Sequence, residues 1–260
     1  MIDLHAHVLS ALDDGARSLD ESVDIARMAG RTGVRTIVAT PHIRADYPFE
    51  LTEIDARVAD VNRAIAAAGV AVDVVPGAEI ANDEIARLSD AELRQLSLGR
   101  SGRYVLLETP YRSLGAGGLE PFVRGLASRG FRVVVAHPER NTRLIEPAHV
   151  DRLIALGALF QLTAGSLLGD FGQGTRDRAV ELVRHGRAHV LGSDSHRADG
   201  RPLALATVAG SVLPGLVSES ECRAILVERP QAILAGAEID LPPLRPARRS
   251  LRKRFALRVR

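Results

Sequence analysis

Short apolar runs alternate with longer amphipathic segments along the chain. The short runs are rich in β-branched residues and fall at 2–5, 34–40, 70–77, 103–109, 132–137, 158–163 and 188–193. Between them, apolar residues recur at the three- and four-residue spacing of one helix face, at 19–33, 50–69, 118–130, 148–157 and 173–186. These segments end in Gly, which is favoured at helix C-termini. The pattern predicts that strands and helices alternate about seven times.

Repetition of strand and helix is typical of βαβ units around a parallel sheet. The strands are almost continuously apolar, which suits a sheet buried on both faces. Because no clear nucleotide-binding glycine loop accompanies the units, we predict a closed or nearly closed α/β barrel in preference to an open doubly wound sheet. Residues 80–98 are weakly patterned and predict irregular helix. We expect one domain, residues 1–240, followed by a tail, residues 241–260.

The composition is that of a globular protein with a substantial core. The chain has 260 residues, 46% of them hydrophobic, a typical length for a single α/β barrel. We expect no membrane span, because no run of about 18 apolar residues occurs, and no signal peptide at the N-terminus. The single cysteine, Cys222, excludes an internal disulfide framework and fits a cytoplasmic protein. We interpret Cys222 as structural, because Glu228 stands where a cysteine-based phosphatase needs an arginine.

The charge is unevenly distributed. Residues 245–260 carry eight Arg or Lys and no acid, and since the whole chain sums to +2, the remainder carries a net charge of −6. An acidic body with 3% aromatic residues argues against nucleic acid as a partner. The basic tail is expected to be a disordered, solvated end. The alternative is a weak contact between this tail and an anionic membrane surface.

Histidines and acids follow the ends of six predicted strands. These are His5 and His7, then His42, Glu79, Glu108, His137 with Glu139 and Arg140, and finally Asp194 with His196. Active-site residues of α/β barrels lie at the carboxyl ends of strands, and imidazole with carboxylate is a ligand set for divalent transition metals. Five of the eight histidines lie at such ends. The sequence therefore predicts a metal centre.

Each motif alone has an ordinary explanation. Two histidines one residue apart share a strand face whether or not they bind an ion. Glu139 could be an acid that complements a helix N-terminus. The metal interpretation depends on the recurrence of these residues in register with the strands. The remaining histidines, His149, His185 and His189, are interpreted as surface or packing residues.

The motifs resemble those of a known superfamily. IDLHAH (2–7), DDG (13–15), TPH (40–42), GAE (77–79), ET (108–109), HPER (137–140) and GSDSH (192–196) occur in the order found in the polymerase and histidinol phosphatase (PHP) superfamily. The stretch at 5–42 is most similar to its CpsB/YwqE-type branch of bacterial protein-tyrosine phosphatases. The resemblance runs from residue 2 to about residue 235 and implies a distorted (β/α)7 TIM-like barrel.

The resemblance also implies three divalent metal ions. His5, His7, Glu79 and Asp194 would hold the first ion. Glu79 would bridge to a second, held also by Glu108 and His137, and Asp14, His42 and His196 would hold the third. The family points to Mn²⁺, while this ligand chemistry also suits Fe²⁺, Co²⁺ or Zn²⁺.

Hydrolysis of protein phosphotyrosine is the implied activity. Arg140 matches an arginine that contacts the phosphate, and Arg201 is a second candidate. We expect a hydroxide held between two ions to attack in line while Arg140 grips the phosphoryl group. The substrate implied is the phosphorylated tail of a membrane-bound bacterial tyrosine kinase of capsule or exopolysaccharide assembly.

Other functions are compatible with the same residues. The same scaffold could hydrolyse histidinol phosphate or another small phosphate ester. An amidohydrolase also begins with HxH, but the version with a carboxylated lysine lacks its residue, since the single lysine, Lys253, lies in the tail. A non-catalytic barrel that docks on a kinase would have little use for nine clustered ligands. Residues 47–49 (Tyr-Pro-Phe) could either contact the substrate ring or seat the next helix.

Overall fold

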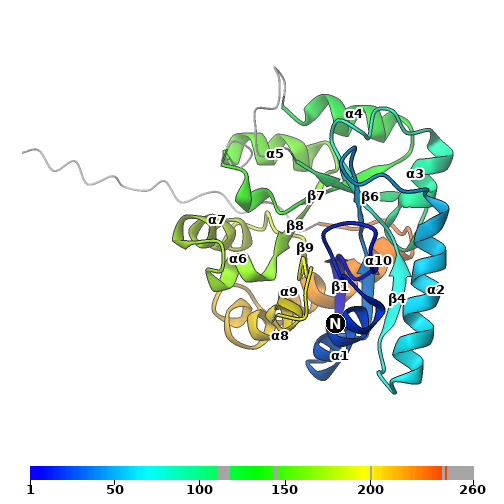
Figure 1. Ribbon diagram of the computed structural model, residues 1–260. Helices are drawn as coiled ribbons and strands as arrows, with labels where there is room; N and C mark the ends of the chain where they lie inside the picture. The colour runs from blue at the N-terminus through cyan, green and yellow to red at the C-terminus, as the bar shows by residue number, and fades with distance from the viewer. Residues whose placement is uncertain (110–117, 143–145, 200, 242–243, 245–260) are drawn as a thin grey trace, which may run out of the picture.

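The computed structural model describes residues 1–109, 118–142, 146–199, 201–241 and 244 (Figure 1). Nine parallel strands form its centre: β1 (Ile2–Ala6), β2 (Thr36–Ala39), β3 (His42–Ile43), β4 (Asp73–Pro76), β5 (Glu79–Ala81), β6 (Tyr104–Glu108), β7 (Arg132–Ala136), β8 (Leu159–Thr163) and β9 (Val190–Gly192). They fall into two sheets, of order β1-β2-β4 and β3-β5-β6-β7-β8-β9. The predicted tail lies outside the described residues except for Leu241 and Leu244.

Two of the predicted strands, 34–40 and 70–77, are each followed at once by a second short strand that the sequence pattern did not indicate. Thr40 and Pro41 separate β2 from β3, and Pro41 has no N–H to continue a ladder. Gly77 and Ala78 separate β4 from β5. The Pro41 carbonyl accepts the N–H of Glu79 at 3.1 Å, and the register places His42 beside Glu79. The seven predicted strands are therefore present, and the breaks bring these two side chains together.

The ring of strands is joined irregularly between β1 and β9. A single bridge links Ala6 to Ser195, where the N–H of His7 donates to the Ser195 carbonyl at 2.8 Å. Nearby, at the same junction between β1 and β9, Oδ1 of the buried Asp3 accepts the N–H of Ser193 at 2.9 Å. Burial raises the pKa of Asp3 to about 6. A side chain thus replaces part of the backbone ladder, which fits the predicted distorted TIM-like barrel.

Helices surround the strands (Figure 1). They are α1 (Leu19–Arg31), α2 (Thr52–Ala67), α3 (Asp90–Leu96), α4 (Glu120–Ser128), α5 (Pro147–Ala155), α6 (Ala164–Leu168), α7 (Gln173–Arg184), α8 (Arg201–Ser211), α9 (Glu219–Arg223) and α10 (Arg229–Leu234). Short helical turns lie at η1 (Leu98–Arg100), η2 (Pro138–Arg140), η3 (Leu213–Gly215) and η4 (Ala224–Glu228). In the described part of the chain, no helix has the length and apolar character needed to span a bilayer.

The segment at 80–98 is more regular than its sequence pattern suggested. It begins inside β5 and contains α3, whose first turn is closed by a capping box between Ser89 and Glu92. The Ser89 side chain accepts the N–H of Glu92, and the Glu92 carboxylate accepts the N–H of Ser89 at 2.8 Å. Reciprocal capping of this kind stabilises a short helix whose apolar pattern is weak.

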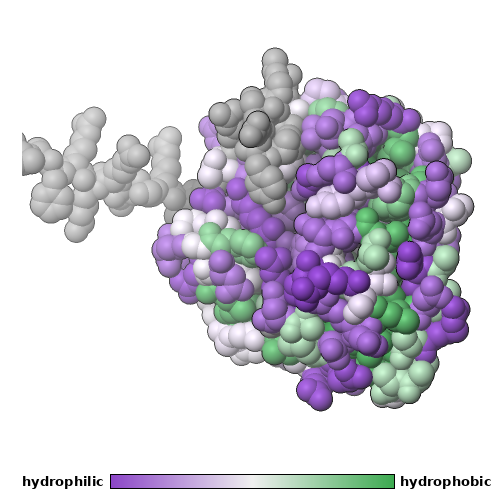
Figure 2. Space-filling model, viewed as in Figure 1, coloured by the Kyte–Doolittle hydropathy of each residue, from purple (hydrophilic) through white to green (hydrophobic). Residues whose placement is uncertain are grey.

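The C-terminal segment covers the amino ends of the strands. Ile233 of α10 packs in a buried cluster with Leu4, Tyr104, Leu106 and other strand residues. Tyr104, at the start of β6, donates its hydroxyl hydrogen to the Ala237 carbonyl at 2.6 Å. Since this end of the barrel is filled, the opposite end, where the strands finish, is left for a site. Figure 2 shows strongly hydrophilic side chains at the centre of the viewed face, over the loop after β1.

Candidate metal centre

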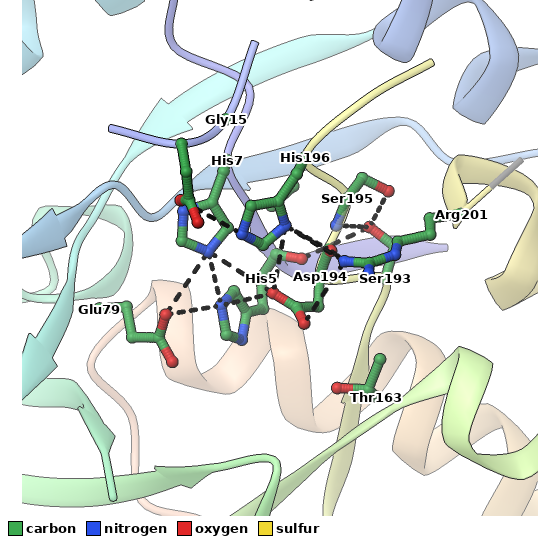
Figure 3. Close-up of polar contacts among 12 residues, drawn as sticks. His5, His7, Gly15, Glu79, Thr163, Ser193, Asp194, Ser195, His196 and Arg201 are labelled. Carbon is green, nitrogen blue, oxygen red and sulfur yellow. Dashed lines mark hydrogen bonds and ion pairs between the residues drawn. The ribbon is translucent and has the colours of Figure 1, made fainter. Parts of the chain in front are cut away.

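The structure brings the nine predicted ligand residues together at the carboxyl ends of the strands. They form four overlapping groups, in each of which the donor atoms lie within 4.8 Å of one another. The groups are His7–Asp14–His42–His196, His5–Glu79–His137, His5–His7–Asp194 and His42–Glu79–Glu108. Several of these side chains point toward one another in Figure 3. Parallel strands explain this meeting, since their ends lie at one edge of the barrel.

The Glu79 carboxylate lies at the middle of the centre and is fully buried. Its Oε2 is 3.2 Å from His5 Nε2 and 3.1 Å from His42 Nδ1, while Oε1 is 2.8 Å from His137 Nε2. Burial opposes ionisation of this carboxyl, but the charges of His5 and His137 hold its pKa well below the usual range. Glu79 is therefore placed to bridge between neighbouring groups of ligands.

Asp194 and His137 both adopt left-handed backbone conformations, with φ of 54° and 31°. Such conformations cost a non-glycine residue about 1–3 kcal/mol and occur at functional sites. They follow the last residues of β9 and β7 and turn the side chains inward. Asp194 Oδ1 then lies 3.4 Å from His5 Nε2 and 3.5 Å from His7 Nε2.

The outer part of the centre is formed by Asp14, His42 and His196. Asp14 Oδ1 is 3.4 Å from His196 Nε2 and 3.6 Å from His42 Nε2, and the Asp14 side chain is 48% exposed. His7 stacks on His196, with ring centroids 4.0 Å apart. His7 thus lies between the first and third predicted ligand sets. His42 likewise lies between the third set and Glu108.

The donor set fits divalent cations. His42 Nδ1 and Glu79 Oε2 are buried, lie 3.1 Å apart and make no hydrogen bond among the described residues. His5 Nε2 and His7 Nε2 face each other at 3.2 Å. Burial, and then the nearby Glu79 charge, raise the pKa of Glu108 to about 7. A cation would satisfy these donors and favour the ionised form of Glu108.

Two residues that support the ligands carried no assignment from the sequence. Asp13 Oδ2 is 2.7 Å from His7 Nδ1 and accepts the His42 N–H at 2.9 Å. Burial opposes ionisation of Asp13, but its contact with His7 lowers the pKa to about 2. Gln161 Oε1 lies 3.0 Å from His5 Nδ1. Asp13 belongs to the DDG motif and Gln161 interrupts an apolar strand, so both left a signal in the sequence.

Both candidate arginines reach the centre. Arg140, in η2 directly after β7, donates from Nη2 to Asp194 Oδ2 at 2.6 Å and to Thr163 Oγ1 at 2.9 Å. Arg201, the first residue of α8, donates from Nη1 to the Asp194 carbonyl at 2.9 Å. The two guanidinium groups therefore both contact Asp194, one at its carboxylate and the other at its carbonyl.

Glu139 has a different place from its neighbours in the HPER motif. It is fully buried, and its Oε1 accepts the N–H of Thr163 at 3.0 Å and the hydroxyl of Ser166 at 2.7 Å. It therefore binds the start of α6 and belongs to none of the four ligand groups. This agrees with the interpretation of Glu139 as an acid at a helix N-terminus.

The two aromatic residues of the loop after β3, Tyr47 and Phe49, have different surroundings. The Tyr47 ring lies nearly parallel to the His42 ring, at 5.6 Å and 9°. Phe49 instead packs against the main hydrophobic core. The two interpretations of this loop thus fall on different residues: Tyr47 borders the centre, and Phe49 anchors the chain before α2.

The chain is similar to proteins of known function over most of its length. Tyrosine-protein phosphatase YwqE of Bacillus subtilis is 34% identical over 230 residues, covering 85% of this chain and 89% of that protein. A solved structure, described as belonging to YwqE from Bacillus subtilis and CpsB from Streptococcus pneumoniae, unique metal-dependent tyrosine phosphatases, matches with a TM-score of 0.82 and 32% identity. That match covers 96% of this chain and 100% of the other.

A more distant match supports the fold alone. The lactonase Lmo2620 from Listeria monocytogenes superposes with a TM-score of 0.61 at 12% identity, over 92% of this chain and 95% of that one.

The family described as capsular polysaccharide synthesis, CpsB/CapC, matches residues 1–235. With the barrel, the metal-ligand cluster and these relatives in agreement, the chain belongs to the CpsB/CapC family.

Proposed function

We propose that this protein is a metal-dependent phosphatase of protein phosphotyrosine. The observation that carries the proposal is the meeting of nine metal-type ligands with two arginines at one end of the barrel. Relatives at 32–34% identity are named or described as tyrosine phosphatases, and the solved one as metal-dependent. Cations beside guanidinium groups suit a dianionic phosphate ester.

Three divalent ions, with Mn²⁺ as the native metal, are the proposed cofactors. The four overlapping groups support more than one ion, and Glu79 would be shared between two of them. Imidazole and carboxylate donors without thiolate suit Mn²⁺, as they suit Fe²⁺, Co²⁺ and Zn²⁺. When bound, such ions lower the pKa of water and neutralise charge on phosphoryl oxygens. Gln161 and Asp13 would orient His5 and His7 toward them.

Arg140 and Arg201 are assigned to the phosphoryl group. Each guanidinium presents several in-plane N–H donors, which match phosphate oxygens in geometry and charge. Arg140 is only 13% exposed, so its charge is weakly screened by solvent. A tyrosyl leaving group has a pKa of about 10 and requires less protonation than an alkyl alcohol. The arginines would therefore contribute to hydrolysis mainly by binding the phosphoryl group and neutralising its charge.

The proposed substrate is a phosphotyrosine-bearing protein, a membrane-bound tyrosine kinase of capsule or exopolysaccharide assembly. The family's description as capsular polysaccharide synthesis supports this choice. Such a kinase would present its phosphorylated tail in the cytoplasm, which fits the single cysteine. Residues 1–240 would form the catalytic domain. The basic tail at 245–260 would strengthen contact with anionic lipid, and its deletion should then reduce liposome binding at low salt.

A comparison of substrates tests the activity. The protein, stripped with a chelator and reloaded with Mn²⁺, is given a phosphotyrosyl peptide, the same peptide with phosphoserine, and histidinol phosphate. We expect metal-dependent release of phosphate, fastest from the phosphotyrosyl peptide. Preference for histidinol phosphate would identify a small-molecule phosphatase instead. Absence of turnover with every ester and every metal would leave a non-catalytic docking protein.

A further inference from the structure

The turn between α6 and α7 places an aromatic ring against a candidate phosphate-binding arginine. The Cζ atom of Arg140 lies 3.8 Å from the centroid of the Phe171 ring, and Cζ of Arg201 lies 5.4 Å from the same centroid. None of the sequence motifs includes Phe171. One ring therefore contacts both guanidinium groups that flank Asp194.

The turn that carries Phe171 has a defined conformation. Gly169 and Gly172 both have positive φ, 99° and 85°, which glycine adopts at little cost. The N–H groups of Gly169 and Asp170 donate to the Gly165 carbonyl at 3.0 Å. A Cβ at Gly165 would lie 2.7 Å from Asp170 Oδ2 and 3.4 Å from Phe171 Cε2. Glycine at these positions thus lets the ring approach the end of β8 closely.

The turn is also tied to the segment that carries Arg140. Nε of Arg178, on α7, donates to the Glu139 carbonyl at 2.7 Å. The Glu139 side chain in turn binds Thr163 and Ser166 at the start of α6. The segment that carries Arg140 is therefore hydrogen-bonded to both helices that border the Phe171 turn, α6 and α7.

The contact with the ring uses none of the hydrogen-bond donors of Arg140. A guanidinium whose flat face rests on an aromatic ring keeps its N–H groups in the plane, directed outward from its edge. Nη2 of Arg140 uses that edge for Asp194 and Thr163. The ring thus restricts the position of the guanidinium, whose Cζ lies 3.8 Å from the ring centroid, while its N–H groups remain for polar partners.

We propose that Phe171 is a positioning residue that holds Arg140 and Arg201 in the orientation in which they bind the phosphoryl group. This inference rests on the proposed function. Contact with an aromatic face favours one placement of a cation, and its loss lets the long side chain sample other rotamers. The effect belongs to phosphate binding, and the metal ligands are left in place.

The experiment compares Phe171→Leu, which keeps an apolar side chain without the aromatic face, with Phe171→Tyr, which keeps the face. Inorganic phosphate is the probe, as a competitive inhibitor of the Mn²⁺-loaded protein acting on a phosphotyrosyl peptide. In Phe171→Leu we expect the inhibition constant for phosphate to rise roughly 3- to 30-fold and kcat/KM to fall by a similar factor. Phe171→Tyr should recover most of both, and Mn²⁺ content should stay unchanged.

Two further measurements separate positioning from a general structural role. In an Arg140→Gln background, Phe171→Leu should have a much smaller effect than in the wild type, as coupled residues require. In the metal-free protein, the NMR signal of the Arg140 Nε–H should move when the ring is removed, even if activity is lost for another reason. Equal phosphate inhibition in wild type and Phe171→Leu, or full additivity with Arg140→Gln, would overturn the inference. Wild-type protein inactive on every phosphate ester would instead refute the proposed function.

Discussion

The Nδ1 atom of His7 lies 2.7 Å from Oδ2 of Asp13, and the same carboxylate oxygen accepts the backbone N–H of His42. One side chain therefore fixes both the ring of His7 and the start of β3. A carboxylate on Nδ1 holds the imidazole with Nε2 directed into the site, the arrangement found behind many metal-ligating histidines.

Replacement of Asp13 by Ala should weaken metal binding. We expect Mn²⁺ affinity, measured by isothermal titration, to fall about 10- to 100-fold, because His7 loses its orientation and basicity. Asp24→Ala, which removes an exposed carboxylate of α1, is the matched control and should leave the affinity unchanged. Equal affinity in Asp13→Ala and wild type would show that Asp13 does not orient a ligand.

Replacement of Arg140 should remove activity without removing metal. For Arg140→Gln we expect kcat/KM on a phosphotyrosyl peptide to fall about 100-fold or more, since a largely desolvated charged donor to the phosphoryl group is lost. Arg152→Gln removes an exposed arginine that pairs with Glu120 and serves as the control. Near-normal turnover by Arg140→Gln would remove this residue from the mechanism. Loss of Mn²⁺ would show that Arg140 supports the ligands instead.

Metal removal should lower stability as well as activity. The native centre gathers several buried acids and imidazoles, while the unfolded chain offers no such site, so binding favours the folded state. At free Mn²⁺ about 100 times the dissociation constant, the gain is about 2.7 kcal/mol, which raises the melting temperature by about 5–10 °C. Calorimetry with and without chelator measures it. An unchanged melting temperature with saturating Mn²⁺ would contradict binding at this site.

His189 should make stability sensitive to acid. Burial, and then the nearby charge of Arg229, lower its pKa to about 3, whereas the unfolded chain takes up a proton near pH 6.5. The contribution of His189 to stability is therefore full above about pH 6.5 and declines as pH falls toward 3. By pH 5 the loss reaches about 2 kcal/mol.

The matched variant is His189→Asn, because Asn can keep an acceptor for the Phe160 N–H that His189 Nδ1 now accepts at 2.8 Å. Denaturant unfolding of the metal-free proteins at pH 7.5 and pH 5 gives the comparison. The variant should lose less stability than the wild type between these values. Equal losses would mean that His189 does not remain neutral in the folded protein.

Much of the site could be predicted because it follows a simple rule. The ends of parallel strands meet, and the polar residues at 5, 7, 42, 79, 108, 137, 194 and 196 interrupt apolar runs at those ends. The alternation of strands and helices could likewise be predicted from the sequence. The division of the ligands into sets came only from the family resemblance, since the position of His42 beside Glu79 depends on the break at Pro41.

Other features depend on tertiary contacts that leave no periodic pattern. Phe171 lies in a turn whose letters, LGDFG, predict only a change of direction. The proposed role of Phe171 depends on its contact with Arg140, about thirty residues earlier, and on the hydrogen bond between α7 and η2. The role of Glu139 likewise depends on β8 and α6. Local sequence cannot report such partners.

The hydrogen bond from Ser193 to Asp3, which helps to join β9 to β1, links residues 190 positions apart. A nascent chain emerging from the ribosome would therefore carry its first two histidines long before their partners at 194 and 196 existed. The two ligand groups that include Asp194 or His196 can form only after β9 has been synthesised, whereas the other two groups need no residue beyond His137. A product that ended before Ser193 would lack Asp194, His196 and Arg201, and with them two of the four ligand groups.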